Sequence, residues 1–77
     1  METKELVGKW IESEVLMDTR DVPADTAYRV VGYNADMNAA IVDAGPRGWK
    51  GLDSDDIVIE KCETYWYILP VDITKVL

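Results

Sequence analysis

Residues suited to recognition chemistry gather first in the segment Gly45 to Gly51. It combines three glycines and a proline with Arg47, Trp49 and Lys50. Glycine and proline favour a turned, projecting backbone, and Trp and Arg are enriched among the residues that dominate protein interfaces. The segment lacks the residue order of a Walker loop, so it does not predict a phosphate site. Trp49 is predicted either to anchor a protein partner or to fold back as a cap on the core, and the sequence leaves both open.

An acidic turn follows directly. Asp53, Asp55 and Asp56 stand within four residues, just before the apolar run Ile57 to Ile59. Close carboxylates can hold a divalent cation or perturb one another's pKa values. More often such a turn is solvated and keeps a neighbouring strand from aggregating, and we favour that interpretation. If Trp49 is a cap, these carboxylates are the alternative binding face.

The chain is poor in two of the residue types that usually catalyse reactions or bind metal ions. The chain has no histidine and a single cysteine, Cys62, which excludes the usual zinc-site spacings and an internal disulfide. Cys62 is expected to be a small apolar filler. The segment Asn34 to Asn38 begins like an EF-hand loop, but Ala39 and Gly45 stand at the positions that require Gly and Glu. We therefore expect no metal, no cofactor and no catalysis; a small oligomeric enzyme with a site between subunits remains an alternative.

The charge balance is acidic, with fifteen Asp and Glu against eight Lys and Arg and a net charge of −7. Nucleic-acid affinity comes largely from Lys and Arg, so direct binding to DNA or RNA is disfavoured. The same charge permits the alternative of a nucleic-acid mimic that occupies a basic groove on another protein. We expect neither a signal peptide nor a membrane span, because the first residues are charged and the longest apolar run is far shorter than a span requires. These features, with one unpaired cysteine, predict a cytoplasmic protein.

Most of the chain is predicted to form strands. β-Branched and aromatic residues fill four short runs separated by turn residues, at residues 28–33, 39–42, 57–62 and 65–69. Residues 6–17 fit a strand better than a helix, and residues 18–26 read as a polar loop. Pro70 cannot continue a central strand, so a single helical turn over 70–73 and a last strand over 74–77 are expected. The predicted core contains Val30, Ile41, Val58 and Ile68.

This order resembles an SH3-like small barrel, in particular the short SH3-like proteins of phages and bacteria. The segments that carry the resemblance are Val7-Gly8-Lys9-Trp10-Ile11, Tyr28 to Tyr33, the glycine-rich turn Gly45 to Gly51, and Trp66-Tyr67-Ile68-Leu69-Pro70-Val71-Asp72-Ile73. The resemblance implies one domain over residues 1–77, a five-stranded antiparallel barrel with a single helical turn before the last strand. The Ala-Leu-Tyr-Asp-Tyr segment and the Trp-Trp pair of peptide-binding SH3 domains are absent, so proline-rich peptide binding is not carried over.

The function expected from these features is a non-catalytic protein-binding module, such as a phage-derived inhibitor or adaptor. Its expected partner is a protein, and a homo-oligomer is compatible with so small a core.

Overall fold

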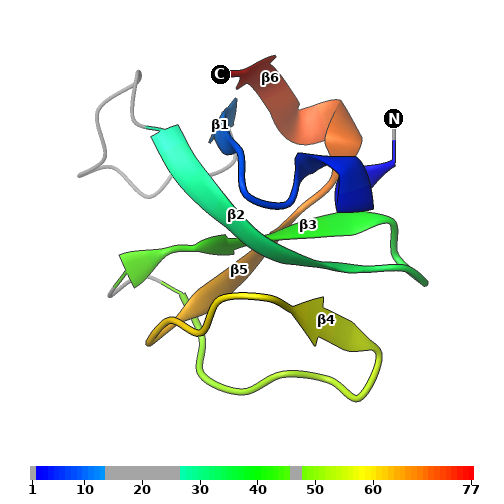
Figure 1. The fold of residues 1–77 in the computed structure, drawn as a ribbon, viewed down its shortest axis with the longest axis vertical. Helices are drawn as coiled ribbons and strands as arrows, with labels where there is room; N and C mark the ends of the chain where they lie inside the picture. The colour runs from blue at the N-terminus through cyan, green and yellow to red at the C-terminus, as the bar shows by residue number, and fades with distance from the viewer. Residues whose placement is uncertain (1, 14–26, 46–47) are drawn as a thin grey trace.

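The computed structural model describes residues 2–13, 27–45 and 48–77, and these form an all-β domain (Figure 1). They contain six strands, two 3-10 turns and no α-helix. The strands are β1 (Trp10–Ser13), β2 (Ala27–Asn34), β3 (Ala39–Asp43), β4 (Asp56–Val58), β5 (Tyr65–Ile68) and β6 (Ile73–Val76). The 3-10 turns are η1 (Thr3–Leu6) and η3 (Pro70–Asp72).

β2 is the central strand of the sheet and crosses the molecule diagonally (Figure 1). The antiparallel order is β5-β3-β2-β1-β6, with β4 paired to β2 outside this path. The first half of β2 pairs with β1, where Trp10 lies opposite Arg29. Its second half pairs with both β3 and β4, and Gly32 lies opposite Ile41 and Val58. An eight-residue strand therefore serves two parts of the sheet, with an irregularity between Val30 and Gly32 where they meet.

Gly32 allows β4 to approach β2 closely. A Cβ atom built on Gly32 would collide with the carbonyl oxygen of Ile57 and would lie 2.9 Å from the Cα of Val58. Real Cβ atoms do not come so close to backbone atoms, so any other residue here would push β4 away. The sequence alternation of β2 is thus interrupted by glycine at the point where another backbone must pass.

The buried core consists of two clusters of side chains. Buried side chains from η1 and four strands form the larger cluster: Leu6, Ile11, Val30, Ala40, Val42 and Ile68. The smaller cluster contains Val31, Ile41 and Tyr65, with Trp49, Val58, Cys62 and Tyr67 packed against it. Of the four predicted core residues, Val30, Ile41 and Ile68 are fully buried, while Val58 is only half-buried. Val58 is more exposed because β4 is paired on one side alone, to β2.

The predicted all-β antiparallel architecture is confirmed, as is the helical turn before the last strand, η3. The predicted number of five strands is wrong, because the described residues contain six. Among the described residues, the strand pairings do not close the sheet into a barrel, because β5 and β6 are the two ends of the strand order and do not pair with each other. η3 separates these two strands, and Pro70 at its start has no N–H to continue the ladder of β5.

Two predicted strands have different bounds in the structure. The segment 6–17 begins with Leu6, the last residue of η1, and then contains β1, so the strand interpretation is confirmed for Trp10–Ser13, whereas residues 14–17 lie outside the described residues. The predicted loop over 18–26 also lies outside them. The run 57–62 forms a strand only through Val58, because Ile59 is the last residue to bond β2, through its N–H and the carbonyl oxygen of Val31.

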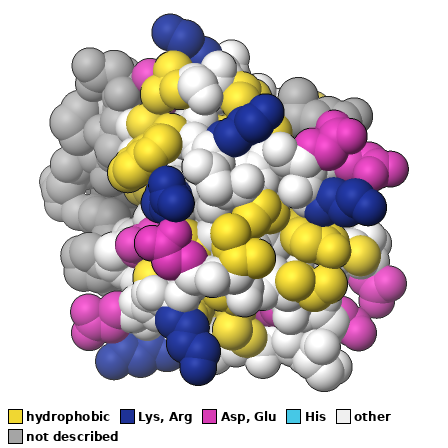
Figure 2. Space-filling view, in the orientation of Figure 1, with side chains coloured by type: hydrophobic (Ala, Val, Ile, Leu, Met, Phe, Trp, Pro, Cys, Tyr) yellow, Lys and Arg dark blue, Asp and Glu magenta, His cyan; other side chains and the backbone are white. Residues whose placement is uncertain are grey.

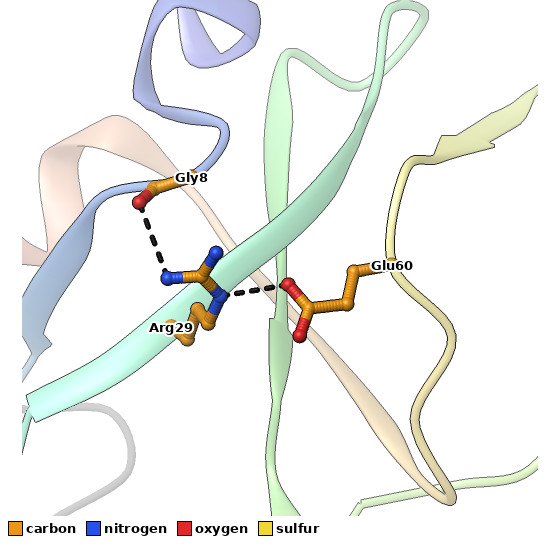
Figure 3. Close-up of polar contacts among 3 residues, drawn as sticks. All are labelled: Gly8, Arg29 and Glu60. Atoms are coloured by element: carbon orange, nitrogen blue, oxygen red, sulfur yellow. Dashed lines mark hydrogen bonds and ion pairs between the residues drawn. The ribbon is translucent and has the colours of Figure 1, made fainter.

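An ion pair secures the chain beyond β4. Arg29 Nε lies 2.7 Å from Glu60 Oε2, and its Nη1 lies 3.4 Å from the carbonyl oxygen of Gly8 (Figure 3). The three residues come from β2, from the segment after β4 and from the segment before β1. Both charged side chains are more than one third exposed, so the pair contributes at most about 1 kcal/mol. Its main effect is to set where the segment after β4 lies.

Candidate functional site

Trp49 lies against β5 and is half-buried. Its backbone forms an isolated antiparallel bridge with Tyr65. The nitrogen of Trp49 lies 3.0 Å from the carbonyl oxygen of Tyr65, and the nitrogen of Tyr65 lies 2.9 Å from the carbonyl oxygen of Trp49. The indole ring packs against two tyrosine rings, with centroid distances of 5.8 Å to Tyr65 and 5.0 Å to Tyr67. Trp49 therefore belongs in part to the smaller core cluster and in part to the surface.

Two glycines bring Trp49 into this place. A Cβ on Gly48 would lie 2.5 Å from the carbonyl oxygen of Tyr65, so only glycine lets this segment lie flat against β5. Gly51 has a φ of +104°, a backbone conformation that side-chain-bearing residues rarely adopt. It turns the chain away from β5 toward the acidic turn. The predicted special backbone of the glycine-rich segment is thus found at both ends of Trp49.

A surface cavity of about 370 Å³ opens beside the indole. We call it the Trp49 cavity and define it by its six lining residues: Trp49, Lys50, Gly51, Leu52, Asp53 and Tyr67. Lys50, Leu52 and Asp53 are exposed, and Leu52 keeps 44% of its surface in solvent. The cavity thus combines an aromatic wall, an exposed aliphatic side chain, one cation and one carboxylate.

Asp56 is the structural centre of the acidic turn. Its Oδ2 accepts hydrogen bonds from Tyr67 Oη at 2.6 Å and from the Asp53 N–H at 2.8 Å, and its Oδ1 accepts one from Asn34 Nδ2 at 2.7 Å. Burial by itself would raise the pKa of Asp56, but these three donors together lower it below 3.8. Asp56 is therefore an ionised acceptor at neutral pH and holds the turn against β2 and β5.

Tyr67 joins the acidic turn to the aromatic wall. Its hydroxyl donates to Asp56 and makes a longer bond of 3.4 Å to Asp53 Oδ2. Burial, and then the hydrogen bond to Asp56, strongly raise the pKa of Tyr67. The phenol stays protonated at neutral pH and acts as a donor, so it does not serve as a general base there.

The structure brings together residues that the sequence offered as alternative sites. Trp49 and Lys50 from the glycine-rich segment line the same cavity as Asp53 from the acidic turn. Asp56 adjoins this cavity through Tyr67, whereas Asp55 is exposed and is not among the lining residues. Arg47 lies outside the described residues.

Two residues that line the cavity, Leu52 and Tyr67, were not among the predicted site residues. Side chains alternate between the two faces of a strand, so Tyr65 and Tyr67 had to share a face and Trp66 had to take the other. The structure confirms this: both tyrosines pack in or against the smaller core cluster, and Trp66 packs against the larger one. The alternation along the strand predicts that the two tyrosines share a face. No feature of the neighbouring sequence indicates that this face contacts Trp49 and Asp56.

The segment Asn34 to Asn38 serves as the turn between β2 and β3. Asn34 is buried, and its Oδ1 accepts a hydrogen bond from the N–H of Met37 at 3.0 Å while its Nδ2 donates to Asp56. Asn38 has a φ of 49°, which asparagine tolerates well. Its Oδ1 lies 3.3 Å from the backbone N and 3.2 Å from the Oγ1 of Thr3, two contacts that tie η1 to the turn.

Cys62 has the surroundings of a structural thiol. It is half-buried beside the smaller core cluster, and its Sγ donates to the carbonyl oxygen of Thr64 at 3.1 Å. Burial, followed by the nearby charge of Asp43, raises the pKa of this thiol. A thiol of raised pKa is a poor nucleophile at neutral pH.

Other parts of the described chain bear on metals, membranes and surface patches. No group of three His, Cys, Asp or Glu side chains is placed to hold a metal ion in ranges 2–13, 27–45 and 48–77. Over the same residues, no helix has the length and apolar character that crossing a membrane demands.

Figure 2 shows hydrophobic side chains gathered over the end of β2 and over β4, with charged side chains around them. Ile57 and Ile59 are 48% and 64% exposed, so this part of the chain presents apolar side chains to solvent directly after the acidic turn.

Comparisons with protein families, with curated proteins and with solved structures gave no match for this chain.

Proposed function

We propose that the chain is a non-catalytic, SH3-like protein-binding module whose contact surface is centred on the Trp49 cavity. The observation that carries the proposal is the convergence of Trp49, Leu52 and Tyr67 around one open cavity with charged residues at its rim. Interface anchors are typically aromatic or aliphatic side chains placed beside a pocket with a polar rim. The SH3-like assignment is supported by the central place of β2, which pairs with β1, β3 and β4, and by η3 directly before β6.

The test is to isolate the partner and to measure its affinity for variants of the cavity. Affinity purification from the native host with mass spectrometry identifies the partner, and calorimetry with the purified pair gives the dissociation constant. Leu52→Ala is the first variant, because Leu52 is exposed and outside both core clusters. We expect it to weaken binding by about 1–2 kcal/mol, within the range of interface truncations, without lowering the thermal midpoint.

Trp49→Ala is the second variant, and we expect a loss of about 2 kcal/mol or more in binding. Trp49 also packs on Tyr65 and Tyr67, so its thermal midpoint must be measured in parallel. Unchanged affinity of Leu52→Ala together with an unfolded Trp49→Ala would contradict the proposal, because Trp49 would then be a cap on the core.

The acidic turn supports a second candidate, a nucleic-acid mimic. Asp53 and Asp55 are exposed on the same turn, next to the cavity, and the chain has a net charge of −7. A DNA- or RNA-handling partner that is released from the chain by short duplex DNA or RNA would favour this function. Binding that is insensitive to nucleic acid would reject it.

A further inference from the structure

The Trp49 cavity combines an aromatic surface with a carboxylate on a strongly acidic molecule. From this combination we propose that the cavity binds an arginine side chain of a basic partner protein. The inference rests on the proposed function, because it specifies the chemistry of the group that the module takes from its partner. Three features carry it: the held indole, the exposed carboxylate of Asp53 and the acidic charge of the molecule; the one cation that lines the cavity, Lys50, opposes it.

The indole of Trp49 packs against two tyrosine rings, and Trp49 is also a lining residue of the open cavity. Tyr65 and Tyr67 pack against it with interplanar angles of 44° and 41°, so two tilted rings support it. Half-burial leaves the remainder of the ring as a wall of the cavity. A guanidinium group stacks on such a ring through cation–π attraction, which is strongest for Trp among the aromatic residues.

Asp53 supplies the charged acceptor. Asp56 already accepts three hydrogen bonds, from Tyr67, Asn34 and the Asp53 N–H. Asp53 is exposed, and its hydrogen bond from Tyr67 Oη is long at 3.4 Å. Tyr67 contacts both the indole and Asp53, and all three residues line the same cavity, so the carboxylate lies on the aromatic side of the cavity. A guanidinium stacked on Trp49 can therefore direct its N–H groups to Asp53.

Charge favours a cation over an anion at this place. The chain carries −7, and the turn that borders the cavity contributes Asp53, Asp55 and Asp56. Lys50 is the single cation among the six lining residues and opposes this preference. Arginine fits better than lysine because its planar group can stack on the indole and bond the carboxylate at once, whereas an ammonium group is compact and strongly hydrated.

The experiment titrates the full chain with N-acetyl-arginine-methylamide and follows amide and indole signals by two-dimensional NMR. The expected result is saturable shifts at the Trp49 indole N–H and at residues 51–53, with a dissociation constant in the millimolar range expected for so small a ligand. The citrulline analogue has the same shape without the charge and is expected to bind at least about tenfold more weakly. Equal shifts with arginine and citrulline would overturn the proposal.

Three substitutions give a pattern of signs that the proposal predicts. Asp53→Asn keeps an acceptor oxygen for Tyr67 but removes the charge, and it should weaken arginine binding about tenfold. Lys50→Met removes the opposing cation and should strengthen binding by about two- to fivefold. Asp36→Asn removes the same charge from the exposed turn between β2 and β3 and should change the affinity by less than about twofold. Equal weakening by Asp36→Asn and Asp53→Asn would show non-specific attraction and overturn the proposal.

The outcomes separate this inference from the proposed function. If the arginine probe does not bind but Leu52→Ala still weakens binding of the isolated partner, the module binds through the cavity without an arginine. Only the inference is then overturned. If Lys50→Met abolishes partner binding, the cavity receives an acidic group, which also overturns it. If neither the probe nor the partner responds to any cavity variant, both proposals fail.

Discussion

Replacing Gly32 by alanine tests the packing of β4 on β2, on which the acidic turn depends. The added Cβ would collide with the Ile57 carbonyl and could be accommodated only if β4 moved by about an ångström or more. That movement would strain or break the bonds of a three-pair ladder and the bond from the Ile59 N–H to the Val31 carbonyl oxygen. Overpacking costs about 1–3 kcal/mol and each lost backbone bond about 1 kcal/mol.

We therefore expect Gly32→Ala to lower the free energy of unfolding by about 2–4 kcal/mol. A chain of 77 residues has a total stability of about 4–12 kcal/mol, so the loss is readily measured by urea denaturation. Hydrogen exchange should show faster exchange of the Ile59 amide, and NMR should show displacement of Asp56, the first residue of β4. The effect should extend to the Trp49 cavity, because Asp56 holds Tyr67.

Gly8→Ala is the matched control for this prediction. A Cβ on Gly8 meets nothing within 4 Å, but the residue has a φ of +89°. Its replacement should cost about 1–2 kcal/mol through backbone strain, with β4 undisturbed. If Gly32→Ala stays within about 0.5 kcal/mol of the parent chain, the size of a neutral surface change, and keeps the Ile59 amide protected, the proposed close contact is refuted.

Three further predictions address the core, the acidic turn and the thiol. Val30 is completely buried, so Val30→Ala should cost about 1–3 kcal/mol in urea denaturation, and a cost near zero would place it at the surface. The lowered pKa of Asp56 stabilises the fold above the ordinary carboxyl range, and this contribution is lost as the pH falls below about 4. Tyr67→Phe removes one of the donors that lower this pKa, so stability measured from pH 7 to 3 should fall less steeply; an unchanged profile would count against the hydrogen bond. The raised pKa of Cys62 predicts slower alkylation by iodoacetamide at pH 7 than that of free cysteine, and equal rates would contradict it.

Local sequence was sufficient for the class of fold and for several of its details. β-Branched and aromatic residues placed β2 and β5 within one or two residues of their observed bounds. Pro70 marked η3, because a residue without an N–H cannot extend a central ladder. The glycines around Trp49 indicated a special backbone, and Gly51 has the positive φ that only glycine adopts easily. These features follow from residue type and near neighbours alone.

Pairing partners were not predictable in the same way. β4 pairs with β2, although more than twenty residues separate Asn34 from Asp56 along the chain. A short apolar run specifies that a strand can form, but the edge it joins depends on which backbone groups elsewhere lack a partner. For this reason Val58 is less buried than expected. The wrong count of five strands came from the resemblance to SH3-like barrels, since each of the six observed strands overlaps a segment that the residues marked as a strand.

The sequence by itself determined an acidic, antiparallel β domain that lacks histidine and has its predicted binding residues in one glycine-rich segment and one acidic turn. Tertiary structure decided that these two segments share a cavity. The link is Tyr67, which packs on Trp49 and donates to Asp56, and these contacts exist only because β5, β4 and the bridge at Trp49 are brought together by the sheet. Contacts between distant segments depend on the packing of the whole core, so residue types and spacing named Trp49, Lys50 and Asp53 but could neither add Tyr67 nor bring these residues together.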